Sequence, residues 1–233
     1  MNFKPILFST EMVKAILSGS KVQTRRVVKP QPIENKHGLE FPHPGCKTTN
    51  GYLLFSGSQT PWSSSPYGQV GDVLWVREKW GKTTNIECRE DLDWPHRPHI
   101  ITDREPNGEI YSAYIYAADG YWQWLDDDGF TTEKSYWKPS IHMPKEACRL
   151  FLKIKSIRVE RLNDITEGDA CLEGVELMDT NRYKDYIDKH NSVISSRISF
   201  ATLWQSINGE ESWNSNPWVW VIEFERIEKP ENF

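Results

Sequence analysis

The 233-residue chain contains no apolar run close to the roughly 18 residues that a membrane-spanning helix needs. Its first residues also lack the apolar core and cleavage site of a secretory signal peptide. We therefore expect a cytoplasmic protein without a membrane partner. The four cysteines are far apart and form no C-x-x-C pair, so reduced thiols are expected.

Several short motifs of enzyme chemistry are also missing. The sequence has no Gly-rich phosphate loop, no G-x-S-x-G nucleophile elbow and no H-x-E…C-x-x-C deaminase signature. His37, His43 and Cys46 lie near one another, but they do not have the spacing of a standard zinc site. The sequence therefore predicts neither a metal ion nor a cofactor.

The chain also carries no net positive charge. The net charge is −5, which argues against a protein that coats long nucleic acid. The charge is unevenly distributed, because acidic residues concentrate in 87–133 and basic residues in 1–36. This asymmetry is compatible with a small or short anionic ligand at the basic end, and equally with ordinary surface charge. The role of the acidic segment and the oligomeric state stay open.

Aromatic residues are abundant, with 11 Trp, 9 Tyr and 9 Phe. The length favours one domain with insertions, which we place at about 33–66, 81–136 and 176–196. Around Ser156 the alternation of apolar residues changes phase, which predicts a β-bulge. Short apolar and β-branched segments predict strands at 3–8, 52–56, 73–78, 112–117, 149–162 and 218–225.

Three helices are expected between these strands. The first spans about 10–18 and ends at Gly19. The second spans about 165–173, begins with an Asp164–Glu167 capping box and ends at Gly174. The third spans about 198–208, where the spacing of Phe200, Leu203, Trp204 and Ile207 predicts an amphipathic helix that ends at Gly209. Together the elements predict an α+β fold built around a small curved sheet or β-barrel with flanking short helices.

The segment after Gly19 carries the densest polar chemistry. Lys21, Thr24, Arg25 and Arg26 follow the first helix within seven residues. In a regular strand Lys21 and Thr24 would point to opposite faces. They share a site only if the turn after Gly19 extends through about residue 22.

These residues resemble the ASCH domain family. The similar motifs are Ile-Leu-x-Gly-x-Lys-x-x-Thr-x-Arg at 16–26, Gly-Asp-Val-Leu at 71–74, Ile-Thr-Glu at 165–167 and Trp-Val-Ile-Glu-Phe at 220–224. They occur in family order and bracket nearly the whole chain. The segments 140–144 and 216–220 look like the longer members encoded by phages and prophages. The resemblance implies a PUA-like β-barrel.

The resemblance also implies a nucleoside or RNA setting. Small bacterial members include an amidohydrolase that removes the acetyl group from N4-acetylcytidine, and others are reported to bind or cleave RNA. The lysine, threonine and glutamate of the amidohydrolase fall on Lys21, Thr24 and Glu173. This chain differs from the small amidohydrolase in two ways. It has Leu172 where that enzyme has a polar residue beside the glutamate, and it contains large insertions that the enzyme lacks.

Other residue types suit the recognition of a nucleoside. Arginine can bind ribose, phosphate or a developing negative charge, and tryptophan offers a face on which a base can stack. The candidate substrate-binding residues are Arg25, Arg26, Trp75, Arg77, His142, Trp218 and Trp220.

Three functions remain open from the sequence. The first is an amide hydrolase that acts on an N4-acylated cytidine or a similar small base. The second is a module that binds RNA or a modified base without turnover, along a groove with Arg25, Arg26, Arg77 and Lys138. The third is a ribonuclease for single-stranded RNA. Each residue also has a simpler role, because lone threonines serve strands and tryptophans usually fill cores.

Overall fold

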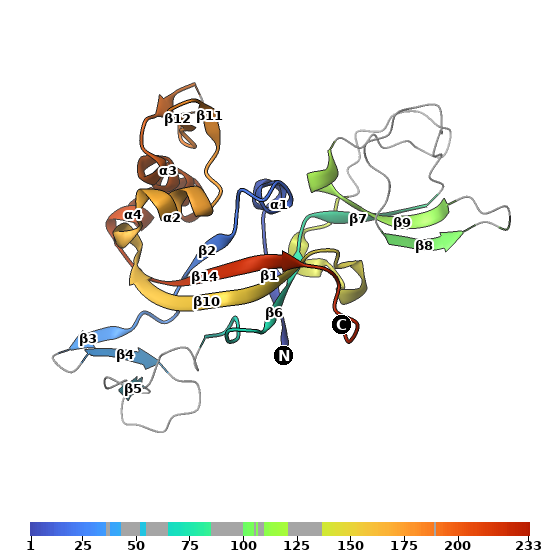
Figure 1. Cartoon of the computed structure of the whole chain (residues 1–233), viewed down its shortest axis with the longest axis horizontal. Coiled ribbons are helices and arrows are strands. Elements are labelled where there is room, and N and C mark those ends of the chain that lie inside the picture. Colours follow the sequence, from blue (N-terminus) through green and yellow to red (C-terminus); the bar gives the residue numbers. More distant parts are fainter. Residues whose placement is uncertain are drawn as a thin grey trace.

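The computed structural model describes residues 1–35, 38–42, 52–54, 65–84, 100–104, 106, 110–120, 137–188 and 190–233. A five-stranded sheet with the order β1-β6-β10-β14-β2 lies at the centre of the molecule (Figure 1). Its strands are β1 (Phe3–Leu7), β2 (Gln23–Val27), β6 (Val73–Arg77), β10 (Phe151–Arg161) and β14 (Trp218–Ile227). β1 and β6 are parallel, and the other neighbours are antiparallel.

Long β-branched and aromatic runs explain why β10 and β14 form the middle of this sheet. Their register shifts between Ile154 and Ser156, so the predicted bulge is confirmed. A core of apolar side chains from β1, α1 (Thr10–Leu17), β6, β10 and β14 covers one face of the sheet. The bulge adds local bend and twist to β10, as bulges do in curved sheets.

The edge strands β1 and β2 are joined by a side chain. Arg26 Nη2 on β2 donates to the carbonyl oxygen of Leu7 on β1 at 2.6 Å, and the Arg26 guanidinium lies 5.0 Å from the centre of the Phe8 ring. Among the described residues β1 and β2 are not paired by a ladder of backbone hydrogen bonds. The structure is therefore α+β with an open, curved sheet, and closure into a barrel is not seen.

Helices cover the β2 end of the sheet (Figure 1). They are α2 (Glu167–Leu172), α3 (Ser196–Asn208) and α4 (Glu211–Asn214). The α2 N-cap is Thr166, whose hydroxyl accepts from the Asp169 N–H and donates to the Asp169 carboxylate. The Asp164–Glu167 capping box was therefore a wrong assignment. The short turn Leu162–Asp164 precedes the helix and moves its start two residues on.

Three smaller sheets lie around this centre, built from segments that we expected to be insertions. Much of 33–66 and 81–136 lies outside the described residues, including His37, His43 and Cys46. The described part of 33–66 contains more strand than we predicted, because only 52–56 was expected there. The sheets comprise β3 (Ile33–Asn35), β4 (Gly38–Pro42) and β5 (Tyr52–Leu54); β7 (Trp80–Thr84), β8 (Ile100–Arg104) and β9 (Ile110–Tyr116); and β11 (Leu177–Asp179), β12 (Arg182–Lys184) and β13 (Ser192–Val193).

Within the described residues, no helix is both long and apolar enough to cross a membrane.

Candidate functional site

A pocket of about 80 Å³ opens where β2, α1, α3 and the end of α2 meet. It is several times larger than the roughly 10–15 Å³ that a single water needs. One side carries charged and polar side chains and the other is mainly apolar, which is the usual composition of a small-molecule site. The lining residues are Met12, Lys21, Thr24, Arg25, Arg26, Val27, Glu173, Phe200, Leu203, Trp204, Ile207 and Asn208.

The turn after α1 determines where Lys21 points. Gly19 has φ +80°, a conformation that glycine adopts without steric cost. The Lys21 N–H then donates to the Ala15 carbonyl at 3.0 Å, and β2 begins only at Gln23. Lys21 therefore precedes the strand. The turn itself covers only Ser18 and Gly19, so it is shorter than expected, but Lys21 and Thr24 line the same pocket.

Glu173 reaches the pocket from the end of α2. It caps that helix and forms an isolated antiparallel bridge with Lys21. The next residue, Gly174, has φ +82°, and a Cβ atom there would lie 2.9 Å from the Lys21 Cβ and 3.1 Å from the Ala15 Cβ. Only glycine allows the end of α2 to approach the turn after α1 so closely.

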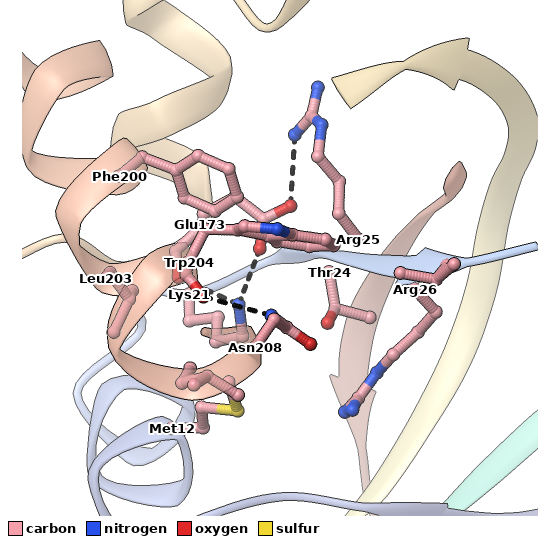
Figure 2. Close-up of a pocket in the computed structure, with 12 residues that line it drawn as sticks. Met12, Lys21, Thr24, Arg25, Arg26, Glu173, Phe200, Leu203, Trp204 and Asn208 are labelled. Atoms are coloured by element: carbon pink, nitrogen blue, oxygen red, sulfur yellow. Dashed lines mark hydrogen bonds and ion pairs between the residues drawn. The ribbon is translucent and has the colours of Figure 1, made fainter. Parts of the chain in front are cut away.

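Lys21, Glu173 and Arg25 form a buried ion-pair group (Figure 2). Lys21 Nζ donates to the Glu173 backbone oxygen at 2.8 Å and to Glu173 Oε2 at 2.9 Å. Arg25 Nη1 donates to the other carboxylate oxygen, Oε1, at 3.0 Å. None of the three residues is more than 4% exposed. Since buried charges are stable only when paired and hydrogen-bonded, each member of this group depends on the others.

Arg25 links this group to a second cluster of charges. Its Nη2 lies 3.1 Å from Glu160 Oε2 and 3.6 Å from Asp169 Oδ2. Both carboxylates also bind the Arg158 guanidinium on β10. Arg25 therefore has carboxylates on both sides, and its charge is compensated without any ligand.

Thr24 and Arg26 are two positions apart on β2 and so project from the same face of the strand. Thr24 is 1% exposed, and Figure 2 shows its side chain between those of Lys21 and Arg26. In the part of the chain that the structure describes, no carboxylate forms an ion pair with Arg26, and its buried Nε has no hydrogen-bond partner. Arg26 is thus a half-buried cation in the pocket wall that interacts with the charge of Glu173 only at longer range.

Burial dominates the electrostatics of the two cations near Thr24. Burial lowers the pKa of the Lys21 ammonium below its ordinary value; Glu173 opposes this effect, and the charges of Arg26 and Arg25 add to it. Burial likewise lowers the pKa of the Arg26 guanidinium. A lysine with a lowered pKa has a larger neutral fraction near pH 7 and can accept a proton.

Helix α3 supplies the wall opposite β2. Phe200, Leu203, Trp204 and Ile207 are the apolar stripe of the predicted amphipathic helix, and all four line the pocket. Trp204 is only 6% exposed, and its indole Nε1 has no hydrogen-bond partner among the described residues. The periodicity identified this stripe, but nothing in the sequence indicated that it faces a pocket. Met12 belonged to the apolar stripe of the first helix, which also gave no indication of a pocket, and no pattern in the sequence pointed to Asn208.

The structure brings together Lys21, Thr24, Arg25, Arg26 and Glu173 of the candidate site residues. The other candidates do not line this pocket. Trp220 is buried in the core of the sheet, and Trp218 lies under the Arg161 guanidinium at 4.4 Å. Arg77 donates to the backbone oxygens of Met143 and Ile141 and lies over Trp75.

His142 is exposed on a short turn, Ser140–His142. Lys138, which the RNA-binding hypothesis added, lies over the Trp80 ring at 5.0 Å. Neither residue lines the pocket.

Comparisons of the chain with models of protein families, with curated proteins and with solved structures found no match.

Proposed function

We propose that the pocket is the active site of an amide hydrolase that removes an acyl group from N4-acylated cytidine or a closely similar nucleoside. One observation carries this proposal. A buried lysine of lowered pKa, bound to Glu173 at 2.9 Å, lines the same small pocket as the Thr24 side chain. These are the residue types that a hydroxyl nucleophile, its base and a group that orients the base require.

In the proposed reaction, neutral Lys21 accepts the Thr24 hydroxyl proton as Oγ1 attacks the acyl carbonyl carbon. The bond between that carbon and N4 then breaks. Its electron pair goes to N4, which takes the proton from the Lys21 ammonium, and cytidine leaves. Water hydrolyses the ester on Thr24 and releases the carboxylic acid. Lys21 is the general base and acid, and Glu173 orients it through Oε2.

The charge that develops on the acyl oxygen needs a donor in the pocket wall. Arg26 is suited to this task, because among the described residues no carboxylate forms an ion pair with it and its Nε, like that of Arg25, has no hydrogen-bond partner. Arg25 is less suited, since Glu160, Asp169 and Glu173 already surround its guanidinium. A preorganised cation in a covered site stabilises a developing negative charge more strongly than it would in water.

The fold supports the same proposal through the ASCH resemblance. We propose that the curved five-stranded sheet corresponds to the PUA-like barrel of that family, with Arg26 joining the two edge strands through the Leu7 carbonyl. The nucleoside would enter over α3, with Trp204 as the aromatic wall. The pocket volume of about 80 Å³ suits the acyl group and part of the base, with the sugar outside.

The test is a deacylation assay with N4-acetylcytidine and purified protein. Thr24→Val, which keeps the buried shape but removes the hydroxyl, should abolish release of cytidine, whereas Thr24→Ser should retain part of it. Lys155→Gln is the matched control, because the Lys155–Glu225 pair is exposed. If N4-acetylated nucleosides and nucleotides stay intact with wild-type protein, the proposal is wrong.

A further inference from the structure

The half-buried charge of Arg26 indicates which kind of ligand the pocket favours. Its guanidinium donates to the Leu7 backbone oxygen at 2.6 Å and lies over the Phe8 ring, and neither partner carries a negative charge. Within the described residues its Nε has no partner. Arg26 is half-buried and lines the pocket, so an anion bound there would pair with its guanidinium.

A second donor in the pocket is also unsatisfied. Trp204 Nε1 is buried and has no acceptor in the described part of the chain, although the indole lines the pocket. An indole N–H can only donate. Lys21 Nζ adds a third donor, since an ammonium has three N–H groups and the structure uses two of them.

The carboxylate of the pocket is already engaged. Glu173, the one carboxylate in the lining, receives Lys21 on one oxygen and Arg25 on the other. The charged groups of the polar wall therefore offer donors and positive charge to a ligand, beside the neutral side chains of Thr24 and Asn208. The opposite wall, with Met12, Leu203 and Ile207, is apolar.

We propose that this pocket binds short-chain monocarboxylates, with the carboxylate toward Arg26 and Trp204 and the alkyl group against α3. A carboxylate supplies two acceptor oxygens and one negative charge, and it pairs well with a guanidinium. The alkyl group explains why an apolar wall faces the cations. The volume of about 80 Å³ holds only a few carbon atoms, so the rest of a longer chain would extend outside the pocket without contacts there.

This inference rests on the proposed function in one respect only, namely whether the bound carboxylate is a product of the protein's own reaction. If the pocket deacylates a nucleoside, the carboxylate is the released acid, and acetate should inhibit the reaction competitively. If the pocket only binds acids supplied from elsewhere, acetate should bind in the absence of any turnover. Binding and hydrolysis are measured separately, so either idea can fail without the other.

The experiment is a titration of the full chain with sodium acetate, butyrate and octanoate, followed by protein NMR at constant ionic strength. Acetate and butyrate should bind with a Kd in the millimolar range, as expected of so small a ligand, and octanoate should bind more weakly. Trp204→Phe, which keeps an aromatic ring but removes the N–H, should weaken acetate binding about 10-fold, as should Arg26→Gln. Lys155→Gln should leave it unchanged.

Circular dichroism and thermal unfolding establish that each variant is folded, and inorganic phosphate serves as the comparison anion. The proposal is overturned if acetate does not bind the wild-type protein. It is also overturned if folded Trp204→Phe and Arg26→Gln both bind acetate as tightly as wild type. Tighter binding of phosphate than of acetate would show a general anion site and would equally contradict it.

Discussion

Lys21 and Glu173, 152 positions apart in the sequence, are bound to each other twice. The Lys21 ammonium donates to the Glu173 backbone oxygen at 2.8 Å and to its side-chain oxygen Oε2 at 2.9 Å. The backbone contact fixes the lysine head regardless of the state of the carboxylate. The pair thus connects the turn after α1 to the end of α2 and provides the charged centre of the pocket.

Replacing Lys21 should reveal how much stability this buried pair contributes. Lys21→Met keeps the aliphatic stem but leaves Oε2 of Glu173 without its partner. Loss of one partner of a buried pair typically costs about 3–5 kcal/mol, and we expect about 3 kcal/mol because Arg25 still binds Oε1. Urea unfolding gives this difference. The double variant Lys21→Met/Glu173→Gln should recover part of the loss, and a purely additive double variant would contradict the pairing.

Gly174→Ala should destabilise the protein more than Gly19→Ala. Both glycines have nearly the same positive φ, +82° and +80°, so both variants incur about 1–2 kcal/mol of backbone strain. Only at Gly174 does the new Cβ lie against other atoms, 2.9 Å from the Lys21 Cβ, whereas nothing lies within 4 Å at Gly19. The extra loss of unfolding free energy in Gly174→Ala, compared with Gly19→Ala, measures how closely Gly174 packs against Lys21. Equal losses in the two variants would contradict this close packing.

Glu167 should make stability depend on pH in the acid range. Hydrogen bonds from Ser195 and Ser196, with a further one from the Arg197 N–H, lower the pKa of Glu167 to about 2. An unfolded chain has the ordinary value, 4.5. Between these values the unfolded state binds more protons, so the contribution of Glu167 is full above about pH 5 and disappears as the pH falls toward 2.

Urea unfolding of wild type and Glu167→Gln at several pH values tests this contribution. The difference in free energy between them should shrink as the pH falls from 5 to 2. Ser196→Ala, which removes one of the donors to Glu167, should give an intermediate pH dependence. A difference that stays constant with pH would show that the hydrogen bonds do not favour the ionised carboxylate.

The pH profile of deacylation should report on Lys21. Burial lowers the pKa of its ammonium, and the proposed base is the neutral amine, so kcat/KM should rise with pH and level off at an inflection below the ordinary lysine value. Arg26→Gln removes a charge that lowers the Lys21 pKa, so it should move the inflection to higher pH in addition to reducing the rate. An inflection that stays in place would exclude Lys21 as the titrating group.

Local sequence patterns predicted the elements around the pocket well. Helix α1 was expected at about 10–18 and spans Thr10–Leu17, because Ser9 caps its start and Gly19 ends it. The bulge near Ser156 followed from the change of phase along β10. These features are determined by residues that are close together in the sequence, so a local sequence pattern is enough to predict them.

Long-range packing could not be predicted from those patterns. The role of α3 as a pocket wall depends on which side of its apolar stripe contacts β2, and periodicity is identical for a core face and a pocket face. The carboxylates around Arg25 come from β10 and α2, far away in the sequence. Glu173 was assigned to the site only through the family resemblance, since its position at a helix end, unfavourable for a carboxylate, does not show which residues it contacts.

The most direct test of the central claim is a time course of cytidine and acetate release from N4-acetylcytidine, with wild-type protein and folded Lys21→Ala side by side. We expect equal amounts of the two products to accumulate over many turnovers with wild type, and no release above the spontaneous rate with the variant. Equal rates for the two proteins, or no release by either, would contradict the assignment of Lys21, Thr24 and Glu173 as an amide-hydrolysing site.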